Sequence, residues 1–282
     1  MAPRSLARSA LVALVVAGCG GGHPAMPDTL VASTDPAVPV AGDPVARPPL
    51  ATVGERMSYQ VSLHGVALAE LVIDVTGLAA VGARDALVVE ARVDTRSLAS
   101  LVRPVHDRFT TWLDVGTGRP LQFHAQEGAA QDEHVLEETE ARFAPGQFPV
   151  QLLRGDDAGL VETQVVRGEP FDFAAFLIFL RSWEAPVGSE LVSDIMRSRF
   201  MWRVRVVVGA RGNLVTALGE LPVVRFEGEG VRTLRDGAVD PTSDKRRFTI
   251  WISDDADRVP VKLAAHTDYG DVLLELADYH AP

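Results

Sequence analysis

The chain has 282 residues, of which 47% are hydrophobic, and its formal net charge is −11 at pH 7. This length and apolar content are sufficient to bury a sizeable core. The negative charge argues against nucleic acid as a partner, because phosphate binding requires a basic surface. The chain has a single cysteine, so no disulfide can form within it.

Residues 1–18 have the layout of a secretory signal peptide. Arg4 and Arg8 precede an apolar run over residues 10–16, and two small residues follow it. The apolar run is too short for a transmembrane helix, which needs about 20 residues. We therefore expect residues 1–18 to direct export.

Cys19 directly follows this segment. The sequence Val-Ala-Gly-Cys over residues 16–19 resembles the lipobox of bacterial lipoproteins, in which the thiol is acylated and the cysteine becomes the mature N-terminus. The alternative is a chance cysteine in a signal peptide. Lipid attachment at Cys19 accounts for a lone thiol beyond a membrane, where cysteines usually pair.

The resemblance to bacterial lipoproteins also implies a location. These proteins carry several acyl chains, which suits stable anchoring because one chain binds a membrane only marginally. Residue 20 is Gly rather than Asp. By the lipoprotein sorting pattern, this implies the inner leaflet of the outer membrane, facing the periplasm.

Residues 19–53 are rich in proline and show no sustained hydrophobic period. They are predicted to form a disordered tether, because no element there can bury one face. Prolines favour the extended polyproline form, at about 3.1 Å per residue, so the tether reaches several tens of Å from the membrane.

From residue 54 onward, apolar and polar side chains alternate. Met57, Tyr59, Val61 and Leu63 share one face of a predicted strand, which is typical of half-buried strands. Similar runs occur at 71–75, 87–93, 121–125, 200–208, 248–252, 259–265 and 272–276. Buried parallel strands would instead read as continuous apolar runs. Residues 54–282 are thus predicted to form one mostly β domain, a large curved antiparallel sheet or barrel-like meander of about 10–12 strands.

Two segments are predicted to be helical. Residues 95–103 begin at Thr95, a suitable N-cap, and stop before a proline, which indicates a short helix. Residues 170–183 are apolar on every side of a helical cylinder, which indicates a helix enclosed by protein or lipid. Asp172 near its start and Arg181 near its end complement the helix dipole.

The apolar helix has three interpretations. The helix is a plug in the core, a mobile lid that contacts a hydrophobic ligand, or a surface that dips into the membrane. The side chains that would make these contacts are Phe173, Phe176, Leu177 and Leu180. Ordinary domains bury such segments, which favours the core. The exposure of these side chains distinguishes the interpretations.

Three stretches resemble a bacterial family known as domain of unknown function 3108. Residues 54–75 are similar to its start, although the position that usually holds a small residue or Gly is Glu70 or Ala69 here. Residues 171–188 are similar to its middle. The matching C-terminal residues are Trp251, Ser253, Asp255, Arg258, Pro260, Val261 and Gly270. The family has no assigned activity, so the resemblance implies an architecture and a setting in the cell envelope but no mechanism.

The sequence Ser-Asp-Asp-Ala-Asp-Arg at residues 253–258 clusters three carboxylates. Such clusters serve acid/base catalysis or bind hard cations, but between strands Asp usually stabilises turns. The pattern lacks the glycine and terminal glutamate of an EF-hand. We therefore expect Trp251, Asp255, Arg258 and Pro260 to be structural, with Arg258 as a charge partner of Asp255.

No catalytic motif is found. The His106–Asp107 pair and His124 with Glu127 each offer single ligands, without a metalloprotease spacing, and no nucleophile elbow, P-loop or dinucleotide fingerprint occurs. We expect no enzyme, cofactor or metal, although a Ser or Asp site assembled from distant strands stays open.

Two non-enzymatic functions remain. One is a membrane-anchored module that holds a lipid or other hydrophobe in a cavity closed by the helix at 170–183. The other is a structural lipoprotein that supports an assembly of envelope proteins. An apolar cavity beneath residues 171–180 favours the first, and a filled interior with an exposed apolar patch favours the second.

Overall fold

The computed structural model describes residues 47–282, apart from 97–104, 130–133 and 268–269. Fifteen strands form a single sheet, and one helix, α2 (Phe173–Ser182), falls within the described residues. The strands are β1 (Arg56–Leu63), β2 (Val66–Val81), β3 (Arg84–Thr95), β4 (His106–Asp114), β5 (Pro120–Ala129), β6 (His134–Arg142), β7 (Gln147–Arg154), β8 (Val161–Val165), β9 (Pro170–Asp172), β10 (Glu190–Arg197), β11 (Phe200–Thr216), β12 (Gly219–Thr233), β13 (Arg246–Ser253), β14 (Pro260–Thr267) and β15 (Gly270–His280).

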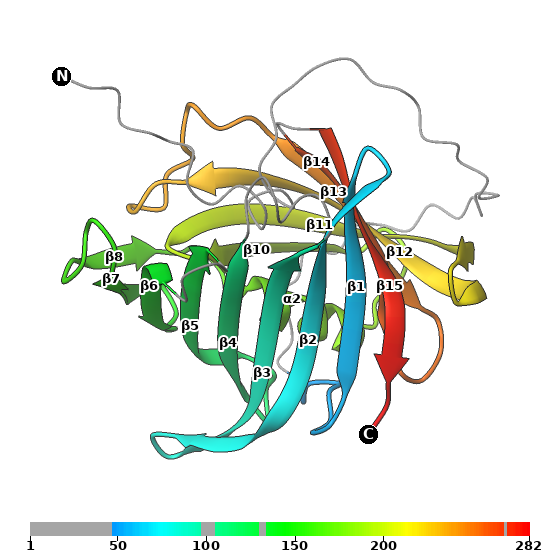
Figure 1. Ribbon diagram of the computed structural model, residues 1–282, viewed down its shortest axis with the longest axis horizontal. Helices are drawn as coiled ribbons and strands as arrows, with labels where there is room; N and C mark the ends of the chain where they lie inside the picture. The colour runs from blue at the N-terminus through cyan, green and yellow to red at the C-terminus, as the bar shows by residue number, and fades with distance from the viewer. Residues whose placement is uncertain (1–46, 97–104, 130–133, 268–269) are drawn as a thin grey trace.

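The first and last strands lie side by side in the middle of the sheet. The strand order is β8-β7-β6-β5-β4-β3-β2-β1-β15-β14-β13-β12-β11-β10-β9, and every pair is antiparallel except β9 with β10. In β1 and β15, Arg56 pairs with His280 and Val61 with Leu274. The sheet is therefore a meander that runs outward in both directions from the central pair β1 and β15 (Figure 1).

This order forces the sheet to curl. Its two edges, β8 and β9, are joined by residues 166–169, a link that spans less than about 20 Å even when fully extended. A flat sheet of this size would be roughly 65 Å wide, because neighbouring strands lie about 4.8 Å apart. The edges must therefore approach each other, although the ladder does not close into a barrel.

Contacts across the gap hold the curled sheet together. The Val165 amide of β8 donates to the Arg235 carbonyl at 2.8 Å. The side-chain amide of Gln164 donates to the Arg199 carbonyl in the β10–β11 turn at 3.1 Å. Arg119 and Glu169 form an ion pair at 3.0 Å. The edge at β8 is thus covered by turns of the opposite half of the sheet.

The predicted fold class, a large curved antiparallel sheet, is confirmed, but the sheet has 15 strands rather than about 10–12. The additional strands include β9, which has only three residues, and β8, whose buried positions are the polar Glu162 and Gln164, so neither shows an alternation of apolar side chains. The predicted helix at 95–103 lies mostly outside the described residues, and Thr95 is the last residue of β3.

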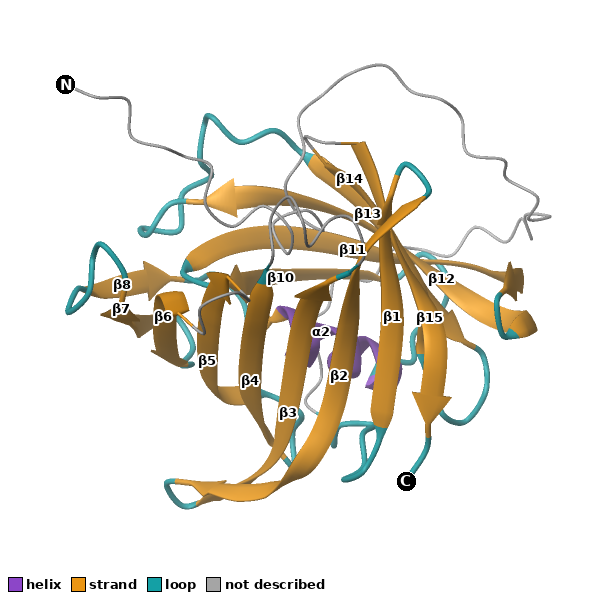
Figure 2. Cartoon of the chain, in the orientation of Figure 1, coloured by secondary structure: helices purple, strands orange, loops and turns teal. Residues whose placement is uncertain are grey.

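Helix α2 lies inside the concave face of the sheet (Figure 2). It begins after Asp172 rather than at residue 170, because Pro170–Asp172 pairs with β10 as the parallel edge strand β9. Proline is tolerated in an edge strand, where its missing N–H group breaks no central ladder. All residues from Ala174 to Arg181 are buried.

The core consists of the inward-facing residues of the strands packed around α2. Phe179 stacks on Trp183 with ring centroids 6.3 Å apart, and Trp183 contacts Phe226 at 5.8 Å. A second cluster lies beneath β5–β7 and the β10–β11 hairpin and includes Phe123, Phe148, Val150, Met196 and Met201. Burial of each large apolar side chain contributes about 1.5–3 kcal/mol.

Residues 47–50, which the sequence assigned to the tether, pack against the folded body. The Arg47 amide donates to the Thr117 carbonyl at 3.2 Å, and the Leu50 amide donates to Ser182 Oγ at 2.9 Å. This segment therefore connects the β4–β5 turn with the C-terminal end of α2. Within the described part of the chain, no helix has the length and hydrophobicity needed to cross a membrane.

Candidate functional site

An apolar cavity of about 90 Å³ lies between the first turn of α2 and the inner face of the sheet. Its walls come from strands of both halves of the sheet and include Val61, Leu71, Val93, Phe109, Trp202 and Leu263. The cavity is partly open to solvent. For comparison, an engineered apolar cavity of about 150 Å³ binds benzene. The space therefore suits a short alkyl segment rather than a whole lipid.

The shape of this cavity depends on small wall residues and on the position of the Phe248 ring. Ala91 of β3 and Ala174 of α2 contribute only a methyl group each to the wall. Phe248, another wall residue, pairs across the strands with Gly228, where an added Cβ would lie 2.1 Å from its ring. Gly228 thus leaves room for the Phe248 ring to lie flat against β12.

The four helix residues singled out in the sequence divide into two groups. Phe173 and Phe176 line the cavity, whereas Leu177 and Leu180 pack into the main core and are 4% and 0% exposed. The helix therefore fills most of the concave space and leaves the cavity beside its first turn.

Asp172 supplies a buried carboxylate at the cavity wall. It is 1% exposed, and its Oδ1 caps α2 by accepting hydrogen bonds from Ala174 N at 3.0 Å and Ala175 N at 3.1 Å. Oδ1 also accepts from Thr111 Oγ1 at 2.9 Å. Among the described residues, Oδ2 has no hydrogen-bond partner. Burial raises the pKa of Asp172 to about 6, against the lowering effect of these hydrogen bonds.

A second charged group, Arg197, also lines the cavity. Its guanidinium forms a long ion pair with Glu127, 3.7 Å from Nη2 to Oε1, and within the described part of the chain its Nε has no hydrogen-bond partner. Burial lowers the pKa of Arg197, while Glu127, Asp107 and Glu137 raise it. The cavity thus has three polar residues, Asp172, Arg197 and Ser198, in an otherwise apolar wall.

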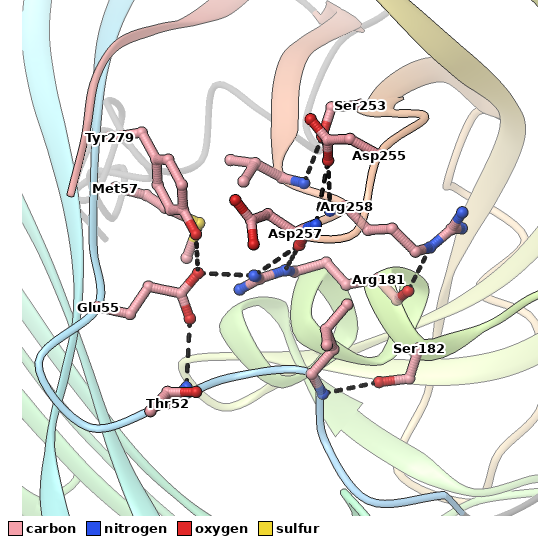
Figure 3. A network of polar contacts seen from close by, with 12 residues as sticks. Thr52, Glu55, Met57, Arg181, Ser182, Ser253, Asp255, Asp257, Arg258 and Tyr279 are labelled. Atoms are coloured by element: carbon pink, nitrogen blue, oxygen red, sulfur yellow. Dashed lines mark hydrogen bonds and ion pairs between the residues drawn. The ribbon is translucent and has the colours of Figure 1, made fainter. Parts of the chain in front are cut away.

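The opposite end of α2 is held by a buried polar network (Figure 3). Arg181 Nη2 lies 2.6 Å from Glu55 Oε1, and both side chains are 2% exposed. The same oxygen accepts a hydrogen bond from the Tyr279 hydroxyl at 3.0 Å, and Arg181 Nη2 also donates to the Asp257 carbonyl at 2.8 Å. Burial, together with the charge of Glu55 and the hydrogen bond to it, raises the pKa of Tyr279 to about 12. This network connects the helix with β1, β15 and the β13–β14 turn.

The turn between β13 and β14, which carries Asp254, Asp255 and Asp257, belongs to this network. Asp255 Oδ1 accepts hydrogen bonds from Ser253 Oγ at 2.8 Å, Asp257 N at 3.1 Å and Arg258 N at 3.0 Å. The guanidinium of Arg258, predicted as a charge partner of Asp255, donates to the carbonyl of Arg181 (Figure 3). It also donates to the carbonyl of Trp183. Asp255 therefore shapes a turn that aims Arg258 at the last carbonyls of α2, where a cation satisfies unpaired acceptors.

The other two residues of this motif are packed in the structure. Trp251 is 7% exposed and belongs to the main core, and Pro260 is buried at the start of β14. Glu55 and Tyr279 were not singled out in the sequence, because an isolated Glu and an isolated Tyr carry no local signal of pairing.

The histidine candidates lie elsewhere. His124 Nε2 is 2.8 Å from Glu138 Oε1, beside a polar hollow of about 160 Å³ that is lined by residues of β3, β4 and β5. His106 pairs with Asp94. Glu127 belongs instead to the apolar cavity's ion pair. Across the described ranges, no group of three or more His, Cys, Asp or Glu side chains is arranged to hold a metal ion.

Comparison with solved structures finds similar proteins, one of which, with a TM-score above 0.5, supports the fold. A β-barrel-like protein of domain of unknown function DUF1849 from Brucella abortus has a TM-score of 0.53 at 12% identity, covering 80% of this chain and 97% of its own. A protein from Bacteroides fragilis, described as exported and as having a YmcC-like fold, has a TM-score of 0.39 at 8% identity, covering 84% of this chain and 99% of its own. A protein from Parabacteroides distasonis, described as a lipoprotein, has a TM-score of 0.36 at 7% identity, covering 85% and 100%.

No curated protein matches the sequence. The family described as "Protein of unknown function (DUF3108)" matches residues 58–277, which include the whole sheet apart from the ends of β1 and β15, the capped helix and the turn that carries Asp255 and Arg258. The chain therefore belongs to the DUF3108 family of proteins of unknown function.

Proposed function

We propose that the protein is a lipid-anchored periplasmic protein that binds a hydrophobic group in the cavity beside α2. The observation that carries this proposal is the apolar cavity of about 90 Å³ that lies beneath Phe173 and Phe176. Interiors of proteins are normally close-packed, and concave apolar spaces with a few polar groups are typical ligand sites. The cavity is small, so we propose that it holds one end of a hydrophobe.

The cavity can be tested by filling it. Replacement of Ala91 by Leu adds three carbons to its wall, and we expect this variant to lose binding of 1-hexanol, used as a small hydrophobic probe. Ala80→Leu makes the same change at an exposed position of β2 and is expected to bind as the unchanged protein does. Binding is measured by chemical-shift titration, with circular dichroism to establish that both variants fold. Equal binding by the Ala91 variant would contradict the proposal.

The natural ligand calls for a separate measurement. Native mass spectrometry after mild extraction from the cell envelope is expected to show a co-purified lipid or other hydrophobe. A bare protein that co-purifies with envelope proteins would instead favour the structural role.

The membrane anchor is proposed from the sequence, because Cys19 lies outside the described residues. Replacement of Cys19 by Ser is expected to release the protein into the soluble periplasmic fraction, since no acyl chain can then be attached. Replacement of Gly20 by Asp is expected to keep the protein on a membrane but to move it from the outer to the inner membrane. Membrane fractionation and intact-mass analysis check both results, and an unmodified thiol on the exported protein would contradict the anchor.

A further inference from the structure

We propose that the tip of the β2–β3 hairpin, residues 77–83, docks on the surface of the lipid bilayer that holds the proposed anchor. This inference is independent of the proposed ligand cavity, but it rests on the proposed attachment of acyl chains at Cys19. It assigns a membrane-binding surface to the folded body in addition to the anchor.

The hairpin tip has no polar side chain. Its sequence is Gly-Leu-Ala-Ala-Val-Gly-Ala, and Leu78 is 66% exposed. Ala80 is also exposed, and Val81 is half-buried. Turns that face water usually carry polar residues, and runs of exposed apolar residues are avoided unless they have a function. The hairpin tip is therefore suited to a less polar environment than water.

The hairpin tip projects from the sheet (Figure 1). β1 pairs with β2 only as far as Asp74, and β4 pairs with β3 only as far as Ala86. A bulge between Val75 and Gly77 lies at the base of the projecting part. None of residues 77–83 is buried. The tip can therefore contact a surface without any movement of a core residue.

The tether leaves the folded body beside this hairpin. The Val115 amide of the β4–β5 turn donates to the Asp85 carbonyl of β3 at 3.1 Å. The Arg47 amide donates to the Thr117 carbonyl of the same turn at 3.2 Å. Arg47 is the first described residue, and the chain before it leads to Cys19. The proposed anchor thus pulls on the end of the sheet from which the hairpin tip projects.

Two other exposed apolar side chains have polar neighbours. The guanidinium groups of Arg199 and Arg232 lie 5.5 Å and 5.8 Å from the ring centre of Phe200. Val215, at the tip of the β11–β12 hairpin, is 79% exposed and is followed by Thr216. Single exposed apolar residues are normal on protein surfaces. Val215 is therefore a suitable comparison site for an experiment.

Docking is limited to the interface of the bilayer. A two-stranded ribbon has backbone groups along its edges without partners, which the hydrocarbon core does not tolerate. Apolar side chains at the boundary between head groups and acyl chains add modest binding. The anchor makes this sufficient, because it keeps the tip at a high effective concentration near the lipid. Docking would fix the orientation of the curled sheet relative to the membrane.

The test places a fluorescent label on the hairpin tip. Ala80→Cys supplies a thiol, and once acyl chains occupy Cys19 no other cysteine in the chain can react. The lipidated protein is reconstituted into vesicles of phosphatidylethanolamine and phosphatidylglycerol that contain a lipid with a nitroxide on its acyl chain. We expect the nitroxide to quench the label at residue 80. A label on Val215→Cys is expected to stay unquenched.

Matched variants test the role of the apolar side chain. Leu78→Asp in the Ala80→Cys protein is expected to lower the docked fraction, measured by quenching, about tenfold, because one large apolar side chain is lost from the interface. Val215→Asp in the same protein makes an equivalent change at an exposed position of β11 and is expected to leave the quenching unchanged. Circular dichroism establishes that both variants fold.

The outcomes separate this inference from the proposed anchor. A protein that does not float with the vesicles would contradict the anchor and the docking together. A protein that floats without quenching at residue 80 keeps the anchor and overturns the docking. Equal quenching at residues 80 and 215 would also overturn it. So would a shift in emission that grows with protein concentration without quenching by lipid, because a second copy would then cover the tip.

Discussion

Replacement of Arg181 by Met is expected to lower the free energy of unfolding by about 3–5 kcal/mol, because it leaves the buried carboxylate of Glu55 without its cation. The pair is 2.6 Å apart, and each side chain is only 2% exposed. Methionine keeps much of the volume of the side chain, so the loss reports mainly on charge. Urea unfolding followed by circular dichroism measures the change.

Two controls sharpen this prediction. Arg211 and Asp254 are also 2.6 Å apart, but the Arg211 side chain is 63% exposed, so Arg211→Met is expected to change stability by less than about 1 kcal/mol. The double variant Glu55→Gln, Arg181→Met removes both charges and is expected to be more stable than Arg181→Met alone. Equal losses of stability in Arg181→Met and Arg211→Met would show that burial does not determine how much the Glu55–Arg181 pair contributes.

The stability of the unchanged protein relative to Asp172→Asn is expected to fall as the pH rises from about 4 to 7. Burial raises the pKa of Asp172 from 3.8 to about 6 in the folded protein, so between these values the folded state binds more protons than the unfolded state. Its contribution is therefore most favourable at low pH and is lost as the carboxyl ionises. The shift of about two pKa units corresponds to roughly 3 kcal/mol.

The comparison with Asp172→Asn is needed because other carboxylates have the opposite effect. Hydrogen bonds from Thr242 and Arg232 lower the pKa of Asp240 to about 2, and such groups lose stability as the pH falls. These contributions are shared by both proteins and cancel in the difference. Urea unfolding of the two proteins at pH 4, 5, 6 and 7 gives that difference, and a value independent of pH would refute the raised pKa.

Much of the sheet could be predicted because alternation is a local signal. Met57, Tyr59 and Val61 face the core of β1, as their spacing indicates. The curling of the sheet could not be predicted in this way, because it follows from the pairing of β1 with β15 and from the short link between β8 and β9. Strand order depends on contacts between distant residues, which periodicity does not report.

The candidate site was predicted only in part. Asp172 and Arg181 were identified from the helix dipole, and Phe173 and Phe176 from the apolar helix. Their partners could not be identified, since Thr111 is 61 positions from Asp172 and Glu55 is 126 positions from Arg181. The cavity itself depends on small residues at distant positions, such as Ala91 and Ala174, which are unremarkable in sequence.

The pairing of β1 with β15 also determines when folding can finish. Hairpins such as β2–β3 and β11–β12 join neighbouring segments and can form early, whereas β1 and β15 must meet across more than 200 residues, as the Glu55–Tyr279 contact shows. A chain that ends before β15 would hold two separate meanders, each with an unpaired strand at the centre of the future sheet. Such exposed edges recruit other chains, so premature termination near the C-terminus should lead to aggregation rather than to a slightly shorter protein.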